Sequence, residues 1–371
     1  HLLEHTTIEE IIDVGGGAFQ SVTAETVIIV LATKIPPEDH KILIKTNLYN
    51  QNNYTPKDVL LKQISQKTYL EQENYNFNLE LQYEELEIIN YMKKIKDCDL
   101  IKYFEAKTCI ATGDDEKFLA DHKVDKSYKK ALRGKNIGRF YIDFDGLHVF
   151  YDVKALHRAR DETIFQKPEK LIMQTISSNL TVAYDNNNYY PLSTCIVIVP
   201  KDKVNTSLSI KYLLLLMNSK LLNFYYDFVF NLGAHLTTEI SVNNINRLPL
   251  KIRENYGFFN VLAISINQMN ENKTLREDNK DYIEFFENLI DILIFEIFFS
   301  DKFQSDGLNT DLLAQISQYI VNRKLNSIKQ IQECIKNMQD DEDIRSETRY
   351  IKNHPWVKII EDYFKKKKKR N

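Results

Sequence analysis

The sequence predicts an α+β protein in which a β-rich region is followed by an α-helical one. Residues 100–207 alternate short apolar runs with polar turns such as Gly113-Asp114 and Asp145-Gly146, a pattern typical of strands. Beyond Pro249, apolar residues recur with the 3.6-residue period of a helix. Two runs rich in β-branched residues near the amino terminus predict the edge of a sheet before both regions.

Chain length sets the number of domains. At about 150 residues per domain, 371 residues make two to three domains, enough to bury cores without disulfide or metal cross-links. We therefore divide the chain into four parts: 1–45 as the sheet edge, 46–99 as a linker with a helical connection, 100–250 as the mixed β-rich domain, and 251–371 as the α-helical domain with a basic tail.

The amino-terminal strands are expected at residues 8–14 and 22–32, with a turn at Gly15-Gly16-Gly17 between them. Residues 45–78 are rich in Asn, Gln and Lys and lack clear periodicity, so we expect a linker or an exposed insertion there. Helical spacing of apolar residues returns at 83–95.

The carboxyl-terminal part is expected to be helical. Residues 208–230 predict one buried helix, which Ser207 or Ser209 can cap. A break is expected at Asp306-Gly307, and the basic run 365–370 is expected to be a frayed terminus that binds any polyanion. The other predicted helices are 258–272, 281–300, 309–322 and 324–339.

Composition argues against several classes of protein. The 4 cysteines are scattered without a CxxC spacing, so neither a zinc site nor a disulfide framework is expected, and a cytoplasmic location is the default. The longest apolar stretches contain charged residues, so no membrane partner is expected. The chain begins at His1 without a signal peptide, and we expect it to be a fragment of a longer protein.

Residues 13–19, from Asp13 to Phe19, imitate the glycine turn by which methyltransferases approach S-adenosylmethionine. Such a turn requires a helix directly after the glycines and an acidic residue about 20 residues further on. Here a β-branched strand follows at once and ends at Thr33-Lys34. A glycine hairpin is therefore the preferred interpretation, and a cofactor turn is the alternative.

Signatures of catalysis are missing from the sequence. The Pro36-Pro37 pair lacks the polar and aromatic neighbours of an amino-methylating loop. Asp39-His40-Lys41 comes nearest to a metal-dependent nuclease centre, but it has no convincing acidic partner upstream. We therefore predict a chain without catalytic residues, metal ligands or a cofactor of its own, inactive when alone.

Charge is distributed unevenly along the chain, and the formal net charge of −3 conceals this. Residues 71–121 hold thirteen acids and six bases, a net −7, whereas 123–139 hold seven bases and one acid, a net +6. A charge run is usually a solvated face. Here, however, the glycine-flexed loop 133–139 carries arginine, asparagine and lysine, which suit guanine edges, adenine edges and phosphates respectively.

The candidate nucleic-acid contacts follow from this charge pattern and from the segment 168–179, an apolar strand that ends in a polar cluster. The ordinary interpretation of that segment, a strand with turn caps, is the alternative. The candidates are Arg133, Lys135, Asn136 and Arg139 for bases and phosphates; Arg158, Arg160 and Lys170 mainly for positioning the DNA backbone; and Gln174, Ser177 and Asn179 for bases.

Several short blocks together carry a family resemblance. They are 108–113 (Thr-Cys-Ile-Ala-Thr-Gly), 132–137 (Leu-Arg-Gly-Lys-Asn-Ile), 156–160 (Leu-His-Arg-Ala-Arg), 168–176, 183–185, 217–221 (Met-Asn-Ser-Lys-Leu) and 248–250 (Leu-Pro-Leu). In these blocks the chain resembles the C-terminal part of type IIG restriction–modification enzymes and related adenine-specific DNA methyltransferases. The closest module is their TaqI-like C-terminal specificity (target-recognition) domain, over roughly residues 100–250.

The resemblance implies that the chain is the specificity fragment of such an enzyme and recognises a sequence in double-stranded DNA. Residues 1–45 would then be the last strands of a truncated methyltransferase domain, with Phe19 stacking on the flipped target adenine. S-adenosylmethionine and Mg²⁺ would serve the missing N-terminal methyltransferase and endonuclease part. Two other functions stay open: a methyltransferase in its own right through the turn at Asp13, or a protein-interaction scaffold built on the helical domain.

Overall fold

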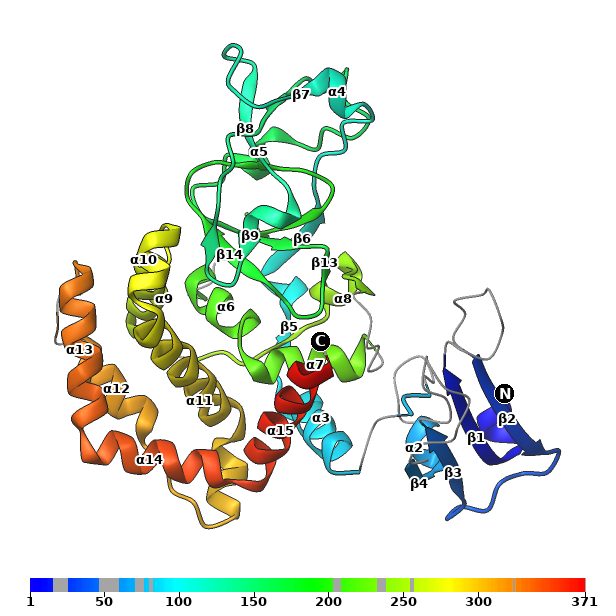
Figure 1. Ribbon diagram of the computed structural model, residues 1–371. Coiled ribbons are helices and arrows are strands. Elements are labelled where there is room, and N and C mark those ends of the chain that lie inside the picture. Colours follow the sequence, from blue (N-terminus) through cyan, green and yellow to red (C-terminus); the bar gives the residue numbers. More distant parts are fainter. Residues whose placement is uncertain are drawn as a thin grey trace. The chain divides into compact units, whose positions relative to one another are not determined.

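The protein is α+β, as expected, with a β-rich region followed by helices (Figure 1). The computed structural model describes residues 1–15, 26–46, 60–70, 77–79, 83–202, 208–231, 238–253, 257–321, 323 and 325–370. The chain folds into two compact units, His1–Ile89 with Asp227–Ala234 and Asn90–Tyr226 with His235–Asn371. No helix within these ranges is both long and apolar enough to cross a membrane.

The first unit is built on a four-stranded sheet in the order β2-β1-β3-β4. Strand β1 pairs antiparallel with β2 and parallel with β3, and β3 pairs antiparallel with β4. Its core is Leu3, Ile8, Ile11, Ile42, Ile44 and Tyr69. The elements are α1 Leu2–His5, β1 Thr7–Gly15, β2 Thr26–Ala32, β3 Lys41–Thr46, β4 Leu60–Ser65 and α2 Gln66–Leu70.

The two amino-terminal strands confirm the hairpin interpretation in part, because β1 and β2 are antiparallel neighbours with Gly15 opposite Thr26. The expectation of a linker or an insertion over 45–78 is wrong for β4 and α2. Gln66 is buried there because its amide donates to Leu3 O and Thr6 O and accepts from Ile8 N. Phe19, Gly16 and Gly17 lie outside the described residues.

The β-rich part of the second unit contains two four-stranded sheets, in the orders β15-β8-β11-β7 and β14-β12-β16-β6. Two-stranded pairs β10-β9, β13-β17 and β18-β5 complete it. The strands are β5 Cys98–Asp99, β6 Phe104–Thr108, β7 Leu119–Ala120, β8 Tyr128–Leu132, β9 Ile137–Gly138, β10 Tyr141–Ile142, β11 His148–Phe150, β12 Lys170–Gln174, β13 Ile176–Ser177, β14 Val182–Asp185, β15 Tyr190–Pro191, β16 Cys195–Pro200, β17 Thr238–Glu239 and β18 Pro249–Leu250.

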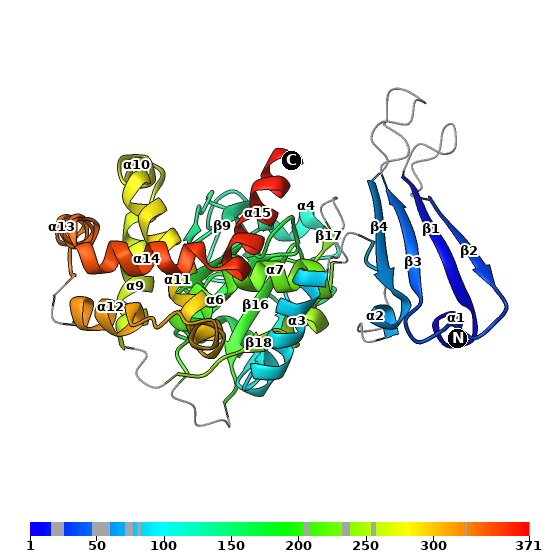
Figure 2. The same ribbon diagram turned by 90° about the horizontal axis from the view of Figure 1, so that it is seen from below.

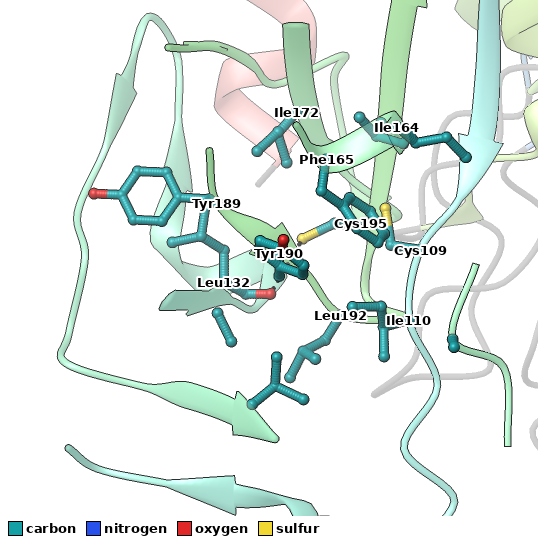
Figure 3. Close-up of a cluster of buried hydrophobic side chains, with 14 of the residues drawn as sticks. Cys109, Ile110, Leu132, Ile164, Phe165, Ile172, Tyr189, Tyr190, Leu192 and Cys195 are labelled. Carbon is teal, nitrogen blue, oxygen red and sulfur yellow. Dashed lines mark hydrogen bonds between the residues drawn. The ribbon is translucent and has the colours of Figure 1, made fainter. Parts of the chain in front are cut away.

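Short helices connect these strands, and a single core joins the two four-stranded sheets. Figure 3 shows Leu132, Tyr190 and Cys195 from the two sheets meeting Phe165 of the α5 segment 162–165 in this core. Burial raises the pKa of the Cys195 thiol to about 12, so this cysteine is an inert core residue. The short helices are η2 Leu100–Lys102, α4 Asp115–Phe118, η3 Gly134–Asn136 and α5 Glu162–Phe165.

The remaining helices include α11 Lys280–Ser305, a 26-residue helix whose middle is buried from Leu289 to Phe299. It ends where the sequence predicts a break, and Gly307 takes a positive φ of 83° there. The others are α3 Tyr83–Ile95, α6 Ile210–Met217, α7 Lys220–Val229, α8 Val242–Asn246, α9 Gly257–Met269, α10 Lys273–Asp278, α12 Leu312–Val321, α13 Ile328–Asp340, α14 Glu342–Asn353 and α15 Pro355–Arg370.

The single helix expected over 208–230 is two helices, α6 and α7, interrupted at Asn218 and Ser219. Ser209 caps α6 by accepting from Lys211 N, as the sequence predicts. The interruption has a polar cause: the Asn218 amide accepts from Val182 N and donates to Val182 O, which ties this point to strand β14. Hydrophobicity alone does not reveal such a side chain-to-backbone pair.

One ion pair is completely enclosed in the β-rich core. Lys170 and Asp185 face each other across β12 and β14, both side chains are 0% exposed, and Lys170 Nζ lies 2.8 Å from Asp185 Oδ2. Asp185 also accepts from Asn187 N and Tyr189 N, so its carboxylate orders the turn after β14. A buried pair of this kind is costly to break, because the charge left behind has no water.

We predict that Lys170→Met destabilises the β-rich region by roughly 3–5 kcal/mol, since Asp185 keeps its charge and loses its partner. The double variant Lys170→Met/Asp185→Asn should recover most of that loss, because an amide oxygen still accepts from Asn187 N. Urea unfolding followed by circular dichroism measures both. A single variant as stable as the parent would contradict this role.

We also predict that stability in the helical region depends on the titration of Glu296, which lies in α11 and accepts from Leu313 N at 2.7 Å. Burial raises the pKa of Glu296 to about 7, against roughly 4.3 in an unfolded chain. The folded state therefore favours the protonated acid, and stability is lost as the pH rises through this interval.

Glu296→Gln removes that titration. Its stability advantage over the parent should therefore grow by roughly 2–3 kcal/mol between pH 5 and pH 8. Trp356, the sole tryptophan, packs edge-to-face against Phe299 of α11 and gives a fluorescence signal for unfolding of this region. Glu333→Gln on the exposed face of α13 is the control. An advantage that does not change with pH would contradict the prediction.

Candidate nucleic-acid interface

The basic loop, residues 133–139, follows strand β8 and is held rigidly by its own polar groups. Asn136 is buried, where its side chain accepts from Arg133 N and donates to Asp143 O, both at 2.8 Å. Gly134 N donates to Thr194 Oγ1, and a Cβ at Gly134 would lie only 2.8 Å from Thr194 O. The local sequence therefore fixes the loop's backbone before any ligand arrives.

Two cations project from this rigid loop. The side chain of Arg133 is 36% exposed and that of Lys135 is 65% exposed. Arg133 Nη2 lies 3.3 Å from Asp115 Oδ2, and Asp115 Oδ1 accepts a hydrogen bond from Thr112 Oγ1. Lys135 Nζ lies 2.9 Å from Asp145 Oδ2. Such surface pairs contribute little energy, so they orient the cations while leaving them available to an anion.

The groups around Asp145 favour its ionised form and so lower its pKa. Partial burial raises the pKa, but hydrogen bonds from Lys135, Asn136 and Leu147 N outweigh it, and the pKa lies below its usual value. The carboxylate beside Lys135 is therefore charged throughout the physiological pH range.

Other cations predicted to contact nucleic acid are committed to internal partners. Arg139 pairs with Glu287 of α11 at 2.7 Å and donates to Asn218 O at 2.8 Å. Arg158 Nε donates to Cys109 O and Arg160 Nε to Thr108 O, so both fasten their segment to the end of β6. These contacts use part of each guanidinium for internal acceptors, and a role of the three arginines in reading or positioning DNA stays a prediction.

Three further candidates use their side chains for contacts within the protein. Lys170 is enclosed with Asp185, and Asn136 uses its amide within the loop. Gln174 donates to Ile137 O and so ties β12 to the basic loop. Sequence reasoning could not separate these residues from exposed ones, because charge and residue type do not report burial.

Ser177 and Asn179 lie on a second surface, Ser177 at the end of β13 and Asn179 in the turn that leads to β14. Ser177 Oγ is 3.1 Å from Thr181 Oγ1, and Asn179 is exposed. This turn and the basic loop are separate features of the second unit.

Lysines before the basic loop form a third group, which the list of candidate contacts omitted. Lys123 and Lys126 are exposed in the connection between β7 and β8, and Lys130 is exposed on β8. Figure 1 shows β7, β8 and α4 at the end of the β-rich region away from α11 to α15. The net charge of +6 over 123–139 includes these lysines, so charge density is the signal in the sequence that indicates them.

A metal site has no support in the part of the chain that the structure describes. No three His, Cys, Asp or Glu side chains within it come together in a way that could hold a metal ion.

Comparison with known proteins gives a family match and one relative. Residues 129–250 match the family described as the TaqI-like C-terminal specificity domain. A putative type II restriction enzyme and methyltransferase from Methanocaldococcus jannaschii is 25% identical over 242 residues, which cover 60% of this chain and 18% of that protein. The chain thus spans less than a fifth of the length of this curated relative.

Two solved structures share a distant likeness. The first is a type IIL restriction–modification enzyme, MmeI, in complex with DNA, with a TM-score of 0.42 at 10% identity. The alignment covers 91% of this chain and 46% of the MmeI chain. The type IIG restriction endonuclease BpuSI gives 0.35 at 10% identity, covering 91% and 44%. The resemblance predicted from the motifs is confirmed by the family match: over residues 129–250 this chain is similar to the TaqI-like C-terminal specificity domain.

Proposed function

We propose that this chain recognises a sequence in double-stranded DNA as the specificity part of a type IIG-like restriction–modification enzyme that methylates adenine. The observation that carries the proposal is the rigid basic loop with two solvent-accessible cations, the half-buried Arg133 and the exposed Lys135, inside the segment that matches a specificity domain. The proposal also rests on the similarity to a putative type II restriction enzyme and methyltransferase.

Rigidity of the loop suits base reading. An arginine contacts guanine through two parallel hydrogen bonds, which require its guanidinium to be held in one plane. Asp115, which accepts a hydrogen bond from Thr112, contacts Arg133 from the side, while the Asn136 amide and Thr194 hold the backbone beneath it. Because these groups are ordered before binding, little conformational entropy is lost when DNA arrives.

The lysines before the loop suit phosphates. Lys123, Lys126 and Lys130 are exposed cations close in sequence to Arg133, and a lysine neutralises a phosphate as a point charge without fixed geometry. In this proposal they fix the position of the duplex, and Arg133 reads a base edge. Ser177 and Asn179 supply further polar contacts from their own separate surface.

The first unit supports a role within a larger enzyme. Residues Val27 to Leu31 of β2 are apolar and exposed, and among the described strands β2 pairs on one side with β1 only. An open apolar edge of this kind favours pairing with a further strand. We propose that the methyltransferase part packs here, that it binds S-adenosylmethionine, and that Phe19 stacks on the target adenine.

Arg133→Ala and Lys135→Ala separate the two kinds of contact. With a site selected from a random-sequence duplex pool, Arg133→Ala should cost about 1–3 kcal/mol and relax the preference at one base pair. Lys135→Ala should weaken all duplexes alike and lower the slope of log K against log salt by about 1. Gel-shift titrations at several salt concentrations measure both.

The matched control is Lys329→Ala, which removes an exposed cation from α13. It should leave both the selected sequence and the salt slope at the parent values. The proposal fails if Arg133→Ala selects the same sequences with the parent's affinity.

A further inference from the structure

The last helix, α15, extends as a helix through the basic run to Arg370, which corrects the expectation of a frayed terminus. Its early turns are packed, with Val357 and Ile360 buried and Tyr363 edge-on to Phe224 of α7 at 5.6 Å. Figure 1 shows α15 ending beside α7. Lys220 Nζ at the start of α7 lies 2.8 Å from Glu361 and adds a polar tie.

The basic end of α15 is anchored to the turn that carries two of the candidate base contacts. Lys367 Nζ donates to Ser178 O at 2.5 Å and to Asn179 Oδ1 at 2.9 Å. Two segments nearly 190 residues apart in the sequence, the polar turn 177–179 and the lysine run, therefore form one continuous surface.

Three other lysines of this helix end face solvent. Lys365, Lys366 and Lys368 are exposed, and Lys365 has a single exposed partner, Asp362, at 2.9 Å. Neither Lys366 nor Lys368 forms an ion pair within 4.0 Å among the residues that the structure describes. This differs from Arg133 and Lys135, each of which is held beside an aspartate.

Without a bound anion, the exposed lysines of this surface repel one another. Cations near a helix C-terminus interact well with the helix dipole, but lysines three and four residues apart repel each other. An anion with regularly spaced charges relieves this repulsion, and a DNA backbone carries one negative charge per about 1.7 Å of duplex.

We infer that the lysine end of α15, together with the turn 177–179, is a second contact surface that grips the phosphate backbone of duplex DNA. The inference rests on the proposed function and extends it, because it gives the helical region a contact with the DNA backbone. In this arrangement Lys367 holds the helix against the turn, and Lys365, Lys366 and Lys368 neutralise phosphates. The surface adds affinity without reading sequence.

The test is the triple variant Lys365→Gln/Lys366→Gln/Lys368→Gln, which keeps the Lys367 anchor. Measured by gel shift on duplexes of selected and of unrelated sequence, its salt slope should be smaller than the parent's by about 2–3, or roughly 0.9 per lost phosphate contact. The selected sequence should stay the same. Replacement of the same three lysines by arginine should retain the parent slope.

The charge-matched control is Lys329→Gln/Lys336→Gln/Lys352→Gln, which removes three exposed lysines from α13 and α14. Its slope should equal the parent's. The inference is overturned if the α15 triple variant keeps the parent slope, or if the control lowers the slope equally, because the effect would then be one of net charge.

These results separate the two claims. If the α15 variant keeps the parent salt slope while Arg133 and Lys135 are still required for binding, only the inference of a second contact surface fails. If neither set of variants alters DNA binding, the proposed function fails with it.

Discussion

A charge that leaves water must find a partner, and this constraint divides the cations of the protein into two groups. Lys170 is the extreme case: it is fully enclosed, and Asp185 compensates it while ordering the following turn. Arg139, Arg158 and Arg160 are likewise committed to internal acceptors. Cations that remain at the surface are the most available to a polyanion. They are Arg133, Lys135 and their neighbouring lysines, together with the lysines at the end of α15.

The committed cations also hold the β-rich and helical parts of the second unit together. Arg139 reaches Glu287 of α11, and Arg276 of α10 reaches Asp143 at 2.6 Å while stacking on Tyr141. Burial raises the pKa of Asp291, also in α11, and the charges of Arg139 and Lys220 oppose that rise. The basic loop is thus connected through its far end to the longest helix, so its position depends on the helical scaffold.

Much of the architecture was predictable, because apolar periodicity is a local signal. The helices α9, α11, α12 and α13 lie close to the predicted segments, and Gly307 marks the predicted break. The misses share one physical cause, a polar side chain that satisfies distant backbone groups. Asn218 interrupts a helix by binding β14, and Gln66 lies in a core by binding α1 and β1.

The candidate interface was predictable only as a region. The density of cations over 123–139 indicated the right part of the chain, but residue type could not tell that Asn136 would support the loop from within while Lys135 would face outward. Nor could the sequence place the lysine run of α15 beside Asn179, since a contact across nearly 190 residues leaves no periodic trace.

The central claim is that DNA meets the surface cations and leaves the internal ones undisturbed. Amide hydrogen exchange of the chain, with and without a duplex of the selected sequence, tests it most directly. We predict slower exchange on binding at residues 121–138, and unchanged exchange at 156–162, where Arg158 and Arg160 hold the end of β6. Protection confined to α12, α13 and α14, with none at 121–138, would contradict the account.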